Sequence, residues 1–237
     1  MADSKISAIQ SSLKNKGFSP GEVDGIWGRR TIAAVKKFQQ SEGLTVDGIV
    51  GPNTAEALFE THEDVASLVA LPWMTEAQNL LGTKENRGPL DNPLILDWAE
   101  SLDIHYKGDD VPWCGLFVAH CIGSSLLNEP LPSNPLGARR WRSFGAKTEP
   151  KVGAIMVFWR GSKSGVYGHV GFYTGEDKTS YRILGGNQSD KVCFAWIEKA
   201  RLIDARWPTS ATSLEVGSGV VVMDKAKDIA KSGVSLA

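Results

Sequence analysis

The sequence predicts an α+β fold in two parts, a small three-helix N-terminal domain and a larger domain with helices packed on an antiparallel sheet. Two observations support this prediction. A short motif is repeated within the first sixty residues, among apolar residues at helical spacing. From residue 153 onward, short apolar runs alternate with turn residues, which is typical of antiparallel strands that follow a helical region.

Composition limits the classes of protein that fit. With 237 residues, of which 42% are hydrophobic, each of two domains can bury a core. Lysine and arginine total 26 against 27 acidic residues, and this near balance argues against a nucleic-acid partner. The sequence holds no run of about 18 apolar residues, so we expect no stable membrane insertion. Three cysteines are too few for a disulfide scaffold.

The motif D-G-I-x-G-x-x-T begins at Asp24 and again at Asp47, 23 residues later. Asp-Gly favours a tight turn, and the threonine falls near the start of the next helix. Helices are predicted before, between and after the two turns, the third over residues 53–58 or onward to Val69. The apolar stripes that support the first two are Ile6, Ile9 and Leu13, and Ile32, Val35, Phe38 and Gln39.

This segment resembles the peptidoglycan-binding domain of bacterial cell-wall hydrolases over about residues 5–60. The matching residues are Phe18-Ser-Pro-Gly21, Val23-Asp-Gly-Ile-Trp-Gly28, Thr31, Ala34-Val35, Phe38-Gln39, Gly43-Leu44 and Val46-Asp-Gly-Ile-Val-Gly-Pro52. The resemblance implies a module that anchors an attached enzyme to the wall. Its seven basic and seven acidic residues balance, so binding needs specific contacts. Trp27 and Arg30 are candidates for those contacts, although a core position for Trp27 is equally open.

The expected domains are residues 1–62, a linker over 63–74 with Pro72 as its boundary, a second domain over 75–210 and a tail over 211–237 to which no function is assigned. In the second domain, helices are predicted over 75–81 and 93–102. Strands are predicted over 154–159, 169–174, 181–184 and 192–196.

Cys114 is the candidate nucleophile of the second domain. It follows acidic residues and Pro112, which are helix-start signals, and precedes an apolar helix over 116–122. In the first turn of a helix, free backbone N–H groups and the helix dipole are expected to lower the pKa of the thiol and to support an oxyanion. Cys121 and Cys193 lie in apolar runs and are expected to be inert core residues.

His169 is the candidate base, because it begins a predicted strand and is flanked by Gly168 and Gly171. His120 points about 120° away from Cys114 around the helix, which makes it a poor partner. A third polar residue should orient the imidazole ring. Asn187, at the end of the next predicted strand, is the first choice, and Gln188 and Asp190 are the alternatives.

Four segments of the second domain resemble the CHAP and NlpC-like papain-fold peptidoglycan hydrolases, closest to a CHAP-related branch of phage and prophage lysis proteins. They are Pro112-Trp-Cys-Gly-Leu-Phe-Val118, Gly153-Ala-Ile-Met-Val-Phe158, Gly168-His-Val-Gly171 and Leu184-Gly-Gly-Asn-Gln-Ser-Asp190. The resemblance spans about residues 75–208 and implies a papain-like domain. It gives Cys114 as nucleophile, His169 as base and Asn187 as the third residue, in a metal-free and cofactor-free hydrolysis of a wall amide.

Aromatic residues are candidates for the substrate groove. Trp113, Trp159 and Trp141 are expected either to line a groove for sugars or a stem peptide, or to belong to the core. The amide that is cut stays open, since an N-acetylmuramoyl-L-alanine amidase and a peptide endopeptidase use the same Cys-His apparatus.

Two other classes compete with the cysteine hydrolase. A zinc amidase needs convergent histidines, and the sequence has neither H-E-x-x-H nor C-x-x-C. A wall-binding protein with a decayed catalytic domain is disfavoured because the Cys, His and Asn candidates are all present.

The resemblance also suggests a biological setting. We expect a monomeric phage endolysin whose partner is peptidoglycan. The opening residues lack a Sec-type signal pattern, so the enzyme is expected to stay in the host cytoplasm until it is released to the wall. An antibacterial effector or a prophage wall-remodelling enzyme with the same chemistry is the alternative.

Overall fold

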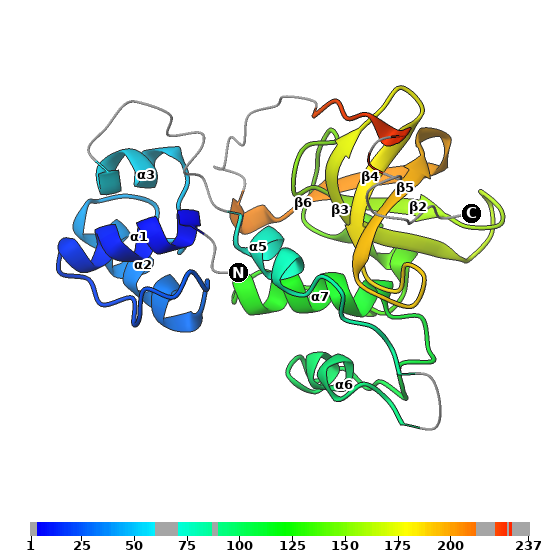
Figure 1. Cartoon of the computed structure of the whole chain (residues 1–237), viewed down its shortest axis with the longest axis horizontal. Helices are drawn as coiled ribbons and strands as arrows, with labels where there is room; N and C mark the ends of the chain where they lie inside the picture. Colours follow the sequence, from blue (N-terminus) through cyan, green and yellow to red (C-terminus); the bar gives the residue numbers. More distant parts are fainter. Residues whose placement is uncertain (1–3, 60–70, 87–89, 212–220, 227, 229–237) are drawn as a thin grey trace.

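The computed structural model describes residues 4–59, 71–86, 90–211, 221–226 and 228. Three helices form the N-terminal part, and helices packed against a six-stranded sheet form the rest, which confirms the α+β prediction (Figure 1). The predicted extension of the third helix to Val69, most of the linker over 63–74 and most of the tail over 211–237 lie outside the described residues.

The N-terminal helices within the described residues are α1 (Ser4–Asn15), α2 (Arg29–Ser41) and α3 (Pro52–Phe59); all three were predicted, the first two from their apolar stripes. Their buried faces meet in one hydrophobic cluster. Its members are Ile6, Ile9, Leu13, Trp27, Ile32, Ala34, Val35, Phe38, Val50, Ala55 and Leu58.

A buried glutamine holds each copy of the repeated turn. Gln10 Nε2 donates to Asp24 Oδ1 (2.9 Å) and to the Ile26 carbonyl (3.0 Å). Gln10 Oε1 accepts from the Gly25 N–H at 2.9 Å. Gln39 makes the same three contacts in the second copy, at 2.7–2.8 Å. The sequence repeat is therefore a repeat of hydrogen bonds, in which one amide side chain satisfies the polar groups of a turn that would otherwise be buried unpaired.

The two turns differ in what covers them. Ile26 in the first copy is 53% exposed, whereas Ile49 at the same place in the second copy is 1% exposed. Ile49 belongs to the hydrophobic cluster of the second part of the chain, which also holds Leu71 and Trp73. The first turn is thus open to solvent while the second contributes to the packing between the two parts.

Three helices belong to the second part: α5 (Pro72–Asn79), α6 (Pro93–Glu100) and α7 (Cys114–Ser125). α5 begins at Pro72 rather than at Thr75, because proline suits the first helical position and Leu71 supplies the cap. The Asn92 side chain caps α6 by accepting from the Leu94 N–H. α7 packs against β3 and β4 of the sheet and also contacts α5 and α6 (Figure 1).

The sheet has the order β1-β6-β2-β3-β4-β5, and all neighbouring strands are antiparallel. The strands are β1 (Ala146–Lys147), β2 (Ile155–Trp159), β3 (Gly168–Glu176), β4 (Ser180–Gly185), β5 (Cys193–Glu198) and β6 (Leu202–Trp207). Short 3-10 helices span Ala138–Ser143, Lys199–Arg201 and Thr209–Ala211. Four strands match the predicted runs; β1 and β6 were not predicted.

The described part of the tail returns to the sheet. The Glu176 N–H donates to the Val221 carbonyl (2.9 Å), and Asp228 accepts from both Arg182 (2.8 Å) and Trp196 (2.8 Å). This segment therefore contacts residues of β3, β4 and the edge strand β5. None of the helices in the described ranges is both long and apolar enough to span a bilayer.

Candidate active site

Cys114 is the first residue of α7, as the sequence predicts, and it is 5% exposed. The loop before it is held by the buried Asp109, whose carboxylate accepts from the backbone N–H groups of Asn86 (3.0 Å) and Asn92 (2.7 Å). The acidic residue thus fastens the loop to the preceding segment. The N-cap of α7 is Trp113, which makes no side-chain capping bond.

Burial decides the protonation state of Cys114. Desolvation raises the pKa of the Cys114 thiol, while the backbone N–H groups of Val170 and Gly115 and the charge of Arg160 offset part of the rise. The prediction that the helix start lowers this pKa is therefore wrong in its net direction. The sulfur keeps its proton at rest and needs a base to become a nucleophile.

His169 lies on β3, opposite Phe158 of β2. The next residue, Val170, is the one whose backbone N–H contacts the Cys114 sulfur. It is 4% exposed. Burial lowers the pKa of His169 to about 4; the hydrogen bond with Gln188 works in the other direction, and the charge of Arg160 adds to the lowering. The imidazole is neutral at pH 7 and is able to accept the thiol proton.

Gln188 fixes which ring nitrogen carries the hydrogen. The Gln188 amide nitrogen donates to the carbonyls of Ile183 (3.3 Å) and Cys193, which turns its Oε1 toward His169. Oε1 lies 2.9 Å from His169 Nε2 and is only an acceptor, so Nε2 must be the protonated nitrogen. Nδ1 is then left with a free lone pair, as the base of a Cys-His pair requires.

Glycine at position 185 makes room for this contact. A Cβ on Gly185 would lie 2.9 Å from Gln188 Oε1 and 3.2 Å from His169 Nε2. Any larger residue would push the amide away from the ring. The Gly-Gly pair before Asn187 is the sequence signal for this close approach.

Asn187, the first choice for the third residue, points elsewhere. Its φ of +53° turns the chain, and its Nδ2 donates to Glu85 Oε2 at 3.2 Å. The same carboxylate oxygen accepts from Trp113 Nε1 at 3.1 Å. Asp190 is exposed, with its carbonyl accepting from the Glu85 N–H (3.0 Å). Of the three candidates, the structure places Gln188 against the imidazole.

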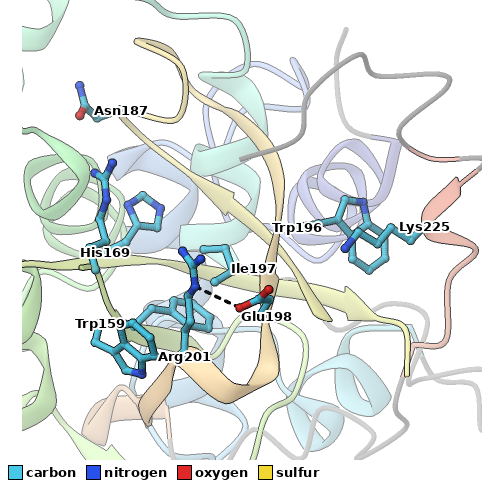
Figure 2. Close-up of a pocket in the computed structure, with 10 residues that line it drawn as sticks. Trp159, His169, Asn187, Trp196, Ile197, Glu198, Arg201 and Lys225 are labelled. Carbon is cyan, nitrogen blue, oxygen red and sulfur yellow. Dashed lines mark hydrogen bonds and ion pairs between the residues drawn. The ribbon is translucent and has the colours of Figure 1, made fainter. Parts of the chain in front are cut away.

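A pocket of about 290 Å³ opens beside His169, the candidate base. Figure 2 shows His169 and Asn187 on one side of it and Trp196 and Lys225 on the other. Other residues that line it are Phe158, Trp159, Arg160, Ile197, Glu198 and Arg201. The pocket next to His169 is therefore lined mainly by apolar, aromatic and cationic side chains, with Glu198 as an acidic member.

The aromatic candidates divide into one pocket residue and three core residues. Trp159 lines the pocket, and the Arg201 guanidinium lies 5.7 Å from its ring centroid. Trp113 and Trp141 are fully buried and Trp27 is 8% exposed within the N-terminal core, so the structure assigns these three to packing.

Arg30, by contrast, is exposed and lines a hollow of about 300 Å³ on the N-terminal module. Ile26 and Asp24 of the open turn line the same hollow. The surface candidate of the module is therefore the arginine rather than the neighbouring tryptophan.

The remaining cysteines and His120 have packing roles. Burial raises the pKa of Cys121 well above its ordinary value, and the Cys193 thiol donates to the Gln188 carbonyl (3.2 Å). His120 Nε2 lies 3.0 Å from Glu76 Oε1, and the ring stacks on Trp98. Within the residues that the structure describes, no three His, Cys, Asp or Glu side chains gather as a metal site would need.

Comparisons with known proteins match two separate segments of the chain to two families. Residues 2–58 match the family described as "Putative peptidoglycan binding domain", and residues 106–187 match the family described as "CHAP domain". The second match includes Cys114, His169 and Asn187 and ends before Gln188.

Several curated relatives are similar over part of their length. The spore cortex-lytic enzyme of Bacillus cereus is 36% identical over 84 residues, 35% of this chain and 32% of the relative. The N-acetylmuramoyl-L-alanine amidase CwlM of Mycobacterium tuberculosis is 39% identical over 54 residues, 23% of this chain and 13% of the relative. The amidase CwlL of Bacillus licheniformis is 42% identical over 57 residues, 23% of this chain and 16% of the relative.

The chain therefore spans about a third or less of these relatives. No significant match to a solved structure was found. Both resemblances seen in the sequence are nevertheless confirmed: residues 2–58 are similar to the peptidoglycan-binding-domain family and residues 106–187 to the CHAP-domain family.

Proposed function

We propose that this protein is a peptidoglycan hydrolase that cleaves an amide bond of the bacterial cell wall with Cys114 as nucleophile. The observation that carries the proposal is the buried Cys114 at the start of α7 together with the buried His169, which contacts Gln188 and lines an open pocket. The matched domain families support the wall as its substrate.

The first half-reaction forms an acyl-enzyme. His169 Nδ1 removes the thiol proton as the Cys114 sulfur attacks the amide carbonyl, which gives a tetrahedral oxyanion. Backbone N–H groups in the first turn of α7 are positioned to stabilise the oxyanion, because the helix leaves them without intrahelical partners. The His169 imidazolium then donates its Nδ1 proton to the leaving amine, and the C–N bond breaks.

The second half-reaction releases the acyl group. His169 accepts a proton from water, the hydroxide attacks the thioester, and the cysteine leaves as the thiol after taking back the proton. Gln188 acts as a positioning residue throughout, because its Oε1 holds the ring in the tautomer that leaves Nδ1 free to serve as the base. Its neutral amide suits this place, since a carboxylate there would face the carbonyl oxygens of Ile183 and Cys193.

The decisive test is Cys114→Ala in a turbidity-clearing assay on purified peptidoglycan. The proposal predicts loss of clearing with wall binding preserved, as measured by co-sedimentation with insoluble wall. Cys121→Ala is the matched control, since it removes another buried thiol of the same helix and should still clear. Clearing that survives Cys114→Ala refutes the cysteine mechanism, and clearing lost only in chelator favours a metal hydrolase.

Wall anchoring by the N-terminal module is a separate part of the proposal. Arg30 in the hollow beside the open turn is the proposed contact for glycan or stem peptide. Arg30→Ala should reduce co-sedimentation of the full chain with wall. Lys37→Ala, which removes an exposed charge outside the hollow, should leave it unchanged.

Mass spectrometry of the digest decides which amide is cut. A new amino-terminal L-alanine on the released peptide identifies an amidase, and an amine within the stem or cross-bridge identifies an endopeptidase. A role in phage lysis, a monomeric state and release from the host cytoplasm stay predictions. Lysis on co-expression with a holin, but not without one, tests the phage setting against an effector or remodelling role.

A further inference from the structure

Arg160 stands at the mouth of the candidate active site and has no role in the mechanism above. It follows Trp159, the last residue of β2, and its backbone N–H donates to the Tyr167 carbonyl (3.2 Å) across the β2–β3 hairpin. Its side chain is exposed and lines the same pocket as His169. The hairpin therefore places a guanidinium at the end of the strand pair that carries the proposed base.

Most other arginines in this part of the chain are bound to protein groups. Arg139 donates to three loop carbonyls, Arg182 pairs with Asp228, Arg201 with Glu198, and Arg206 with Asp204 and two carbonyls. Arg160 has no side-chain hydrogen bond or ion pair among the described residues. Arg140 and Arg142 also have none there, but neither lines the pocket.

The pocket carries an excess of positive charge. Its cations are Arg160, Arg201 and Lys225, and its single anion, Glu198, lies 3.3 Å from Arg201 and is thereby neutralised. The whole chain has a net charge of −1, so this excess is local. The charge of Arg160 also lowers the pKa values of both Cys114 and His169, which places the guanidinium within electrostatic range of the reacting groups.

We propose that Arg160 binds a free carboxylate of the substrate's stem peptide, at a position within about two residues of the scissile amide. This rests on the proposed function. A guanidinium presents paired N–H donors that match the two oxygens of a carboxylate, which makes an unpaired arginine in a pocket a selective site for that group. Each residue of an extended peptide spans about 3.5 Å, so a side chain as long as arginine reaches one or two residues from the sulfur.

The test compares muropeptides that differ in one carboxylate. A set of N-acetylmuramoyl stem peptides is prepared in which each carboxylate in turn is converted to the carboxamide. Values of kcat/KM are measured for the wild type, Arg160→Gln, Arg160→Lys and the control Arg142→Gln. The control removes an exposed arginine outside the pocket.

Amidation of one carboxylate should lower kcat/KM about 10- to 100-fold in the wild type and in Arg142→Gln, as expected for a lost charge-assisted pair. In Arg160→Gln the same amidation should change kcat/KM less than about threefold, because the partner is already gone. Arg160→Lys should retain part of the discrimination, since it keeps the charge but not the paired donors. Equal cleavage of all peptides by the wild type overturns the proposal, as does an equal loss on every peptide in Arg160→Gln.

A binding measurement separates this inference from the proposed function. Calorimetric titration of Cys114→Ala with the acidic peptide and its amidated counterpart reports the subsite without turnover. Selective binding that depends on Arg160, together with no hydrolysis by the wild type, would support the subsite and refute the hydrolase. Cys114-dependent hydrolysis without any preference for the acidic peptide would support the hydrolase and overturn the subsite.

Discussion

Replacing Gln188 with methionine removes the hydrogen bonds that hold the His169 ring and changes the side-chain volume little. The ring loses its acceptor at 2.9 Å, and the carbonyls of Ile183 and Cys193 lose a donor. A buried polar group left without a partner costs about 1–3 kcal/mol. We therefore expect the free energy of unfolding to fall by about 2–4 kcal/mol.

The catalytic loss follows from the same hydrogen bond. Without Oε1 the ring is free to turn and to exchange tautomers, so only part of the population presents Nδ1 to Cys114. Removal of one orienting bond worth about 1.4–2.8 kcal/mol corresponds to a 10- to 100-fold lower kcat. KM should change little, because the amide side chain is fully buried and does not face the pocket.

The assay is dye release from labelled peptidoglycan, with thermal denaturation as the check that each variant is folded at the assay temperature. Asn187→Ala is the matched control, since it removes the neighbouring amide that bonds to Glu85 rather than to His169. It should lower kcat less than about threefold. If Asn187→Ala loses as much activity as Gln188→Met, or more, the orienting role of Gln188 is refuted.

Three further outcomes are expected. Because the folded pKa of His169 is about 4 and its unfolded value is 6.5, the native state binds fewer protons between these values. The free energy of unfolding should fall by about 3 kcal/mol as the pH drops from 6.5 to about 4. Urea titrations should show this fall in the wild type and not in His169→Asn, and the same pH dependence in both proteins would contradict the prediction. Chemical denaturation should show that Ile49→Ala lowers the free energy of unfolding by about 2–4 kcal/mol and Ile26→Ala by less than about 0.5 kcal/mol. Equal losses in the two variants would contradict the different burial of the two turns. Asp228→Ala should lower the melting temperature, because it releases two partners on the sheet; an unchanged melting curve argues against tail docking.

The positions of Cys114 and His169 could be predicted because each depends on local signals. A proline before an apolar helix marks the helix start, and flanking glycines mark a strand that allows close approach. The choice between Asn187 and Gln188 could not be made this way. It depends on left-handed backbone at Asn187 (φ +53°), which turns one amide outward and brings the next one under the ring.

Other features escaped prediction because they arise from tertiary structure. The direction of the Cys114 pKa shift depends on burial, which the position of a residue in a helix does not reveal. β6 was missed because Asp204 and Arg206 interrupt its apolar residues; the two charges lie 3.8 Å apart and pair with each other. The glutamines of the repeated turns were missed because Gln39 lies on the same helix stripe as its apolar neighbours.

The burial of Cys114 also bears on the chemical durability of the protein. Oxidants attack thiolates far faster than thiols, and exposed low-pKa cysteines are the ones that become sulfenic acids. Here all three cysteines are buried and free of disulfides, and Cys114, the proposed nucleophile, is 5% exposed with a pKa that burial raises. The burial and the raised pKa of Cys114 therefore both disfavour oxidation of its sulfur.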